Sequence, residues 1–151
     1  KVGITGNLSA KGNCASFISY INSAGGSTPH VSFINCYART NLSTTSGYDS
    51  AGLAISWNGH PTTAQYCYWS GTNNTTNRVT SLIYPKMEAL PAGVIKNCYY
   101  DKQKFPNSVD SSISGTGLTT EQMKTQSSYV GWDFENTWYM GPDGYPELKF
   151  D

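Results

Sequence analysis

Three cysteines that each precede a tyrosine are the residues of this sequence that most directly suggest chemistry. They are Cys36, Cys67 and Cys98, and the two intervals between them are equal in length. A cysteine can form a disulfide, bind a metal ion or act as a nucleophile. Equal spacing has a different implication, because a fixed period of this length is typical of a structural repeat.

Metal binding and covalent catalysis have little support in the sequence. It contains no Cys-x-x-Cys motif, and His30 and His60 have no neighbouring ligand at a recognised spacing. Either histidine could serve as a base for a cysteine after folding, but three equivalent cysteines argue against one special thiol. The carboxylates Asp49, Glu88, Asp101 and Asp110 are scattered and do not indicate a catalytic pair. We therefore expect no metal and no cofactor.

Composition narrows the classes of partner. The net charge is zero, 13% of the residues are charged and only two are arginines, so no basic stripe is present for a nucleic acid. No run approaches the roughly 20 apolar residues of a membrane helix, so we expect no membrane insertion. Low charge with abundant Ser, Thr, Asn, Gly and Tyr is typical of bacterial β-proteins that are secreted or on the cell surface. The opening "KVGITGN" suggests a piece of a larger multidomain chain.

The elements that must position the cysteines are short strands. Small and apolar residues alternate at 15–19, 51–56 and 80–84, each time before a Cys-Tyr element and separated from it by a polar loop. This period of two, with no helical pattern before residue 118, predicts an all-β fold. The regular recurrence favours a parallel β-helix, which is a solenoid, over a sandwich.

The repeat also predicts local geometry. The interval from Cys14 to Cys36 is shorter than the later ones, and we interpret it as a coil of about 22 residues that acquires insertions in later coils. Asn35 and Asn97 precede their cysteines and suit coil corners, because Asn tolerates the left-handed backbone conformation. Tyr66 occupies the equivalent place before Cys67 and breaks that pattern.

We divide the chain into β-helix coils at 1–117 and a C-terminal cap at 118–151 of the same domain. Thr119 and Gln122 form a capping-box pattern that predicts a short helix at 120–127. The aromatic segment after it is expected to cover the open end of the solenoid. Trp132 and Trp138 are expected to pack inside this cap.

Stacked coils place ladder residues about 4.8 Å apart, farther than the roughly 3.5–4.5 Å between Cβ atoms of a disulfide. We therefore expect buried free thiols at the cysteines. If the cysteines point inward, the tyrosines that follow them point outward. Two alternatives stay open: these tyrosines form an exposed column, or they pack under the long loops. Trp69, two residues beyond Cys67, is expected to point inward.

Several motifs of the C-terminal part occur together with the alternation "AGLAIS" at 51–56. They are "NCYYDKQ" at 97–103, "GTGLTTEQMK" at 115–124, "GWDF" at 131–134 and "GYPELKF" at 144–150. In this combination, which is strongest from about 94 to 150, the chain resembles GLUG-motif repeat proteins, a group of bacterial surface and secreted proteins that includes adhesins. The resemblance implies a right-handed β-helix from an exported protein and attaches no activity to the motif.

Aromatic residues beside polar loops are the main functional signal, since flat exposed rings suit the apolar faces of sugars. We predict a non-catalytic module of a bacterial surface or secreted protein that binds a polysaccharide or host-cell glycan, or serves adhesion. The alternatives are a structural spacer or cap of a longer solenoid, and a polysaccharide lyase or glycosidase. The predicted ligand-binding residues are Trp57, Asn58, His60, Tyr37, Tyr68 and Tyr99.

Overall fold

A computed structural model describes residues 1–21, 31–45, 47–57, 62–75, 79–86, 95–106 and 115–150. Nearly all the regular structure within these ranges is β-strand, with one short α-helix and one short 3-10 helix. The prediction of an all-β fold is confirmed.

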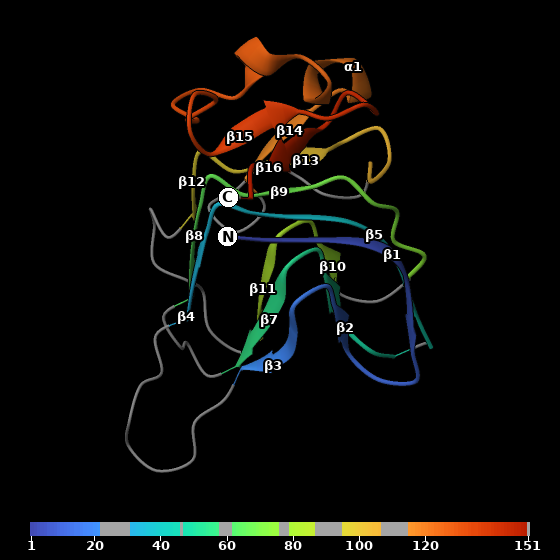
Figure 1. Ribbon diagram of the computed structural model, residues 1–151. Helices are drawn as coiled ribbons and strands as arrows, with labels where there is room; N and C mark the ends of the chain where they lie inside the picture. The colour runs from blue at the N-terminus through green and yellow to red at the C-terminus, as the bar shows by residue number, and fades with distance from the viewer. Residues whose placement is uncertain are drawn as a thin grey trace.

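Four parallel sheets are built from strands that recur in the same order along the chain (Figure 1). Sheet A contains β1 (Val2–Ala10), β5 (Cys36–Thr44), β9 (Tyr68–Trp69), β13 (Tyr99–Asp101) and β14 (Thr116–Leu118). Sheet B contains β2 (Cys14–Ala15), β6 (Ser50–Ala51) and β10 (Val79–Thr80). Sheet C contains β3 (Ile18–Ile21), β7 (Ala54–Trp57) and β11 (Ile83–Lys86). Sheet D contains β4 (Val31–Ile34), β8 (Thr62–Gln65) and β12 (Ile95–Lys96).

The strand register follows the repeat that the Cys-Tyr elements define. Tyr68 pairs with Tyr37 on one side and with Tyr99 on the other, so residues one repeat apart in the sequence are neighbours in sheet A. The three alternating segments also align, because Ala51 pairs with Ala15 and with Thr80 in sheet B.

The first cysteine does not belong to this ladder. Cys14 pairs with Ser50 in sheet B, and the residue of β1 that pairs with Cys36 is Val2. The expected short first coil is therefore wrong, because the step from Val2 to Cys36 is longer than the step from Cys36 to Cys67. The Asn-Cys pair at 13–14 resembles the later Asn-Cys pairs in sequence only. The register depends on which strand of the neighbouring repeat pairs with the segment.

The corners between sheets D and A have the predicted backbone. Asn35, Tyr66 and Asn97 have φ values of 53°, 54° and 49°, in the left-handed region. The two asparagines confirm the prediction made for them. Tyr66 adopts the same conformation, although a left-handed conformation costs a residue of its type roughly 1–2 kcal/mol. Pairing of the strands on both sides of the corner thus overrides the local preference of this residue.

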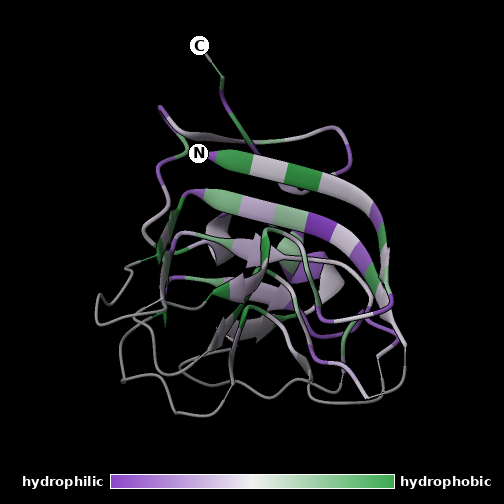
Figure 2. Cartoon of the chain, turned by 90° about the horizontal axis from the view of Figure 1, so that it is seen from below, coloured by the Kyte–Doolittle hydropathy of each residue, from purple (hydrophilic) through white to green (hydrophobic). Residues whose placement is uncertain are grey.

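One hydrophobic core lies on the inner side of sheet A and is closed by the other sheets. It contains all four cysteines, which are buried free thiols as predicted. Trp69 points into this core, also as predicted, and its Nε1 donates to the carbonyl oxygen of Thr40 at 3.1 Å. Figure 2 shows β1 and β5 side by side, with hydrophobic residues alternating along β1.

The C-terminal segment, residues 119–150, packs on the opposite, outer side of sheet A (Figure 1). Thr119 caps α1 (Thr120–Met123) in the predicted capping box with Gln122. The predicted helix ends early, and a 3-10 helix, η1 (Gln126–Ser128), follows it. An antiparallel hairpin of β15 (Trp138–Met140) and β16 (Pro146–Leu148) completes the segment. The segment covers a lateral face, so the expectation that it closes the end of the strand stack is wrong.

Candidate binding site

The tyrosine column points outward from sheet A, as strand alternation predicted, but it is not exposed. Tyr37, Tyr68 and Tyr99 retain 8%, 0% and 7% of their accessible surface. The rings of Tyr37 and Tyr68 are stacked, with centroids 5.4 Å apart. Neither alternative left open by the sequence holds, because the column is not exposed and the C-terminal segment covers it in place of the long loops.

Aromatic side chains of the C-terminal segment fill the space above the column. Trp138 contacts the rings of Tyr37 and Tyr68, and Trp132 contacts those of Tyr68 and Tyr99. Both tryptophans are buried, so the prediction that they pack inside the cap is confirmed. The Tyr68 hydroxyl donates to the carbonyl oxygen of Pro146 at 2.8 Å. A ligand cannot reach the column while this segment is in place.

The other predicted contact residues are not placed by the structure. Asn58 and His60 lie outside the described residues, as do Glu88 and Asp110. Trp57 ends β7, and its side chain is also outside what the structure describes. The role of Trp57, Asn58 and His60 in binding stays a prediction.

The cysteine ladder is a poor site for covalent chemistry. The Sγ atom of Cys98 accepts from the backbone N–H of Cys67 at 3.4 Å, and Cys67 is fully buried. Burial raises the pKa of the Cys67 thiol, and a hydrogen bond with Cys67 is the main cause of the raised pKa of Cys36. Thiolates are the reactive form, so both thiols are inert at neutral pH.

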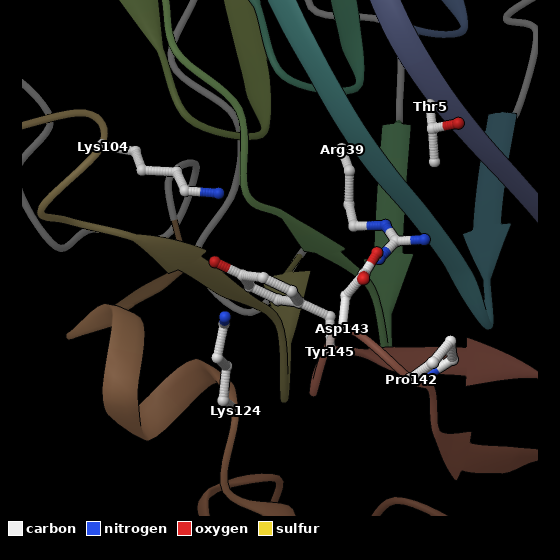
Figure 3. A pocket seen from close by; sticks show the side chains of 7 residues that line it. All are labelled: Thr5, Arg39, Lys104, Lys124, Pro142, Asp143 and Tyr145. Atoms are coloured by element: carbon white, nitrogen blue, oxygen red, sulfur yellow. The ribbon is translucent and has the colours of Figure 1, made fainter.

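A cavity of about 660 Å³ opens beside the tyrosine column, where the C-terminal segment meets sheet A (Figure 3). Residues from separate parts of the chain come together here: β1, β5, the turn after β13, the end of α1, and the hairpin turn together with the residue before β16. The lining residues are Thr5, Arg39, Lys104, Lys124, Pro142, Asp143 and Tyr145.

Tyr145 forms the aromatic floor of the cavity, and Asp101 holds it in place. The Tyr145 hydroxyl donates to Oδ2 of Asp101 at 3.2 Å. Asp101 is completely buried and also accepts hydrogen bonds from the backbone N–H groups of Gln103 and Lys104 and from the Thr120 hydroxyl. This single carboxylate therefore fixes the turn that carries Lys104, the start of α1 and the floor of the cavity.

Arg39 enters the cavity from β5 and is paired with two carboxylates. Its guanidinium donates to Glu147 at 2.8 Å, and the nearest oxygen of Asp143 is 3.5 Å away. The guanidinium carbon lies 5.9 Å from the centroid of the Tyr145 ring. Arg39 thus joins sheet A to the hairpin, and its charge is compensated within the protein.

Two lysines complete the cavity. The Nζ atoms of Lys104 and Lys124 lie 4.8 Å and 5.2 Å from the Tyr145 ring centroid, within cation–π range. Lys104 also donates to the carbonyl oxygen of Ser70 at 3.0 Å. Burial lowers the pKa of Lys104, Asp101 partly offsets this effect, and the positive charges of Lys124 and Arg39 lower that pKa further.

Sequence reasoning missed this cavity because its lining residues share no motif. They are single residues at 5, 39, 104 and 124, and only the hairpin turn at 141–144 had a recognisable turn pattern. One available signal was the rarity of arginine, since Arg39 is one of only two in the chain.

Other kinds of site are not apparent in the part of the chain that the structure describes. No group of three or more potential metal ligands is present in those residues, and no helix there is long and apolar enough to cross a membrane. No family model, curated protein or solved structure matches this chain.

Proposed function

We propose that the parallel sheets are the sides of a right-handed β-helix, the architecture implied by the resemblance to GLUG-motif proteins. Three features support the proposal. The chain passes through sheets A, B, C and D in a fixed order, all the pairings between these strands are parallel, and the corners before the cysteines share one left-handed conformation. The residues at 119–150 form a helix-containing aromatic cap on one side of it.

We further propose that the chain is a non-catalytic module of a bacterial extracellular or cell-surface protein that binds a glycan, and that the cavity above Tyr145 is the binding site. The observation that carries this proposal is the convergence of Arg39, Lys104 and Lys124 on one cavity of about 660 Å³. Ligand pockets usually measure about 300–1,000 Å³ and have a few convergent polar groups. Sugar oxygens accept hydrogen bonds from ammonium and guanidinium groups.

The carboxylates near the cavity favour binding over hydrolysis. A glycosidase uses two carboxyl groups, one as acid and the other as base or nucleophile. Asp101 is buried beneath Tyr145 with several donors, and Asp143 and Glu147 are paired with Arg39. Asp101 and Glu147 thus have structural partners, and the exposed Asp143, which lines the cavity, lacks among the described residues the second free carboxyl group that hydrolysis requires. The lyase or glycosidase is therefore the less favoured interpretation.

Affinity electrophoresis on neutral and acidic polysaccharides tests glycan binding directly. We expect the wild-type chain to be retarded by at least one polymer and the Lys104→Gln/Lys124→Gln variant to be retarded less. Absence of retardation by every polymer in a broad panel would overturn the binding proposal.

A second candidate function, a structural spacer, is favoured by the edges of the first strands. Strands β1, β2, β3 and β4 each lie at the edge of their sheet, with no further strand paired to them among the described residues. Val2 and Ile34 are half exposed on two of these strands. Unpaired edges accept additional strands, so a further layer of the same kind of unit would continue all four sheets.

Sedimentation analysis separates the spacer from the binder. A spacer is expected to self-associate through its open edges as concentration rises, and the Val2→Lys/Ile34→Lys variant is expected to stay monomeric. Association that is absent in the wild type, or unaffected by these substitutions, would count against this candidate.

A further inference from the structure

The positive charge of the cavity is only partly neutralised by the protein. Arg39 has two carboxylate partners, whereas Lys104 and Lys124 form no ion pair with any residue that the structure describes. Both ammonium groups lie near the same aromatic ring, 4.8 Å and 5.2 Å from its centroid. They flank the Tyr145 side chain in the view of Figure 3, and the charge of Lys124 helps to lower the pKa of Lys104. Asp101 partly compensates the charge of Lys104, but its carboxylate is buried and already accepts hydrogen bonds from four donors.

The side chain of Lys104 and the backbone of Lys124 are held in place before any ligand arrives. The backbone N–H of Lys104 donates to Asp101, and its Nζ donates to the carbonyl oxygen of Ser70. Lys124 follows α1 directly as its C-cap residue. Like charges fixed near one another destabilise a folded protein, and an anion between them relieves that repulsion. Preorganised charges also bind more tightly, because little side-chain freedom is lost on binding.

A row of polar side chains continues from the cavity across the outer face of sheet A. Thr5 lines the cavity, and Asn7 follows two residues later on the same face of β1. Asn41 donates to Asn7 at 3.0 Å and accepts from the Thr72 hydroxyl at 3.0 Å. This exposed row offers amide and hydroxyl groups to the hydroxyls of a sugar. A ligand longer than a free anion thus finds partners on both parts of the surface.

From these observations, and resting on the proposed glycan binding at this cavity, we propose that the ligand is an acidic polysaccharide. One oxyanion of a sugar unit, a carboxylate or a sulfate, sits beside the Tyr145 ring within reach of both Lys104 and Lys124. The neighbouring units lie along Thr5, Asn7 and Asn41. Arg39 is not the main anion receptor, because Glu147 and Asp143 already occupy its guanidinium.

The test compares polymers that differ only in charge. Isothermal titration of the intact chain uses polygalacturonate against its methyl ester, and dextran sulfate against dextran. We expect at least one charged polymer to bind at least tenfold more tightly than its neutral counterpart. Preference for polygalacturonate identifies a carboxylate, and preference for dextran sulfate identifies a sulfate.

Two matched variants locate the charge. Lys104→Gln/Lys124→Gln is expected to lower affinity for the charged polymer at least tenfold, with an unchanged circular dichroism spectrum. Lys11→Gln/Lys96→Gln removes the same net charge from exposed lysines that do not line the cavity and is expected to change affinity less than twofold. Equal losses in the two variants would overturn the proposal, because the attraction would then be a general effect of charge.

The outcomes also separate this inference from the proposed function. Equal affinity for charged and neutral polymers, lost in the Lys104→Gln/Lys124→Gln variant, would overturn the acidic ligand and retain glycan binding in the cavity. No binding to any of the four polymers would overturn the acidic ligand, while the broader panel described above decides glycan binding as a whole.

Discussion

The Tyr145 hydroxyl donates to the buried carboxylate of Asp101 across 44 residues of sequence, at 3.2 Å. The carboxylate belongs to the last residue of β13, and the tyrosine immediately precedes β16. This hydrogen bond ties the C-terminal segment to sheet A at the floor of the cavity. It therefore links the stability of the cap to the shape of the candidate site.

Removing this hydroxyl is expected to destabilise the chain. Tyr145→Phe leaves Asp101 buried with one donor fewer, and a hydrogen bond to a charged group contributes about 1.5–3 kcal/mol. We expect the free energy of unfolding, measured by urea denaturation, to fall by about 1–2 kcal/mol. The control is Tyr139→Phe, which removes an exposed hydroxyl that donates to Glu147 and should cost less than about 0.5 kcal/mol. Similar losses in the two variants would contradict the role given to Asp101.

Alkaline pH is expected to unfold the C-terminal segment. Burial, together with Asp101, raises the pKa of Tyr145 to about 12, and burial also raises the pKa of Tyr68 and Tyr129. An unfolded tyrosine titrates near a pKa of about 10. The contribution of these neutral phenols to the free energy of unfolding is thus fully present below pH about 10. It is lost as pH rises through the folded-state pKa values.

Phenolate absorbance and near-ultraviolet circular dichroism, followed from pH about 9 to about 12.5, measure this loss together. We expect a late group of tyrosines to ionise in the same pH range in which the aromatic dichroism disappears. Ionisation of all eleven tyrosines near pH 10, with the dichroism intact, would show that the rings are accessible.

At the corner before Cys98, substitution by alanine and by glycine is expected to affect the stability of the chain differently. Asn97 has a φ of 49°, which alanine adopts only at a cost of roughly 1–2 kcal/mol. Asn97→Ala should lower the free energy of unfolding by about 1 kcal/mol, whereas Asn97→Gly should stay within about 0.5 kcal/mol of the wild type. The hydrogen bond from Trp132 reaches the Asn97 carbonyl and survives both changes. Indistinguishable urea midpoints for the alanine and glycine variants would mean that the backbone at this corner adjusts to remove the strain.

The backbone of Thr40 approaches Gly71 so closely that a methyl group has no room. A Cβ atom at Gly71 would lie 1.7 Å from the Thr40 carbonyl oxygen, whereas one at Gly12 meets nothing within 4 Å. The Gly71→Ala substitution should therefore lower the free energy of unfolding by about 3 kcal/mol or more, or prevent folding. Gly12→Ala should leave the thermal midpoint nearly unchanged. A stable Gly71→Ala protein with native dichroism would refute the close approach.

The cysteine thiols are expected not to react with thiol reagents until the chain unfolds. All four cysteines are buried and unbridged, and only thiolates react readily with thiol reagents. A colorimetric thiol assay should find no reaction in native buffer at neutral pH and four thiols per chain in denaturant without reductant. Two or fewer in denaturant would mean that bridged pairs exist and that the ladder geometry is wrong.

The repeat could be predicted because its signals are local. Equal spacing of Cys36, Cys67 and Cys98 predicted the register of sheet A. Given the expected burial of the thiols, alternation also predicted that the tyrosines point to the opposite side. Asn35 and Asn97 predicted the corners, since few residues tolerate the left-handed conformation. The prediction made from Cys14 was wrong, because a similarity of only two residues, Asn13 and Cys14, does not determine which strand pairs with that segment.

The sequence by itself determined that each cysteine of the ladder and the tyrosine after it lie on opposite sides of sheet A, because alternation with a period of two is a property of the chain alone. Burial of the cysteines in the structure assigns their side to the core. Only the tertiary structure decided what lies on the other side. The C-terminal segment could cover an end or a face, and burial of Tyr37, Tyr68 and Tyr99 beneath Trp132 and Trp138 favours the face. The cavity depends on the same decision, because Arg39, Lys104, Lys124 and Tyr145 meet only where that segment joins the sheet.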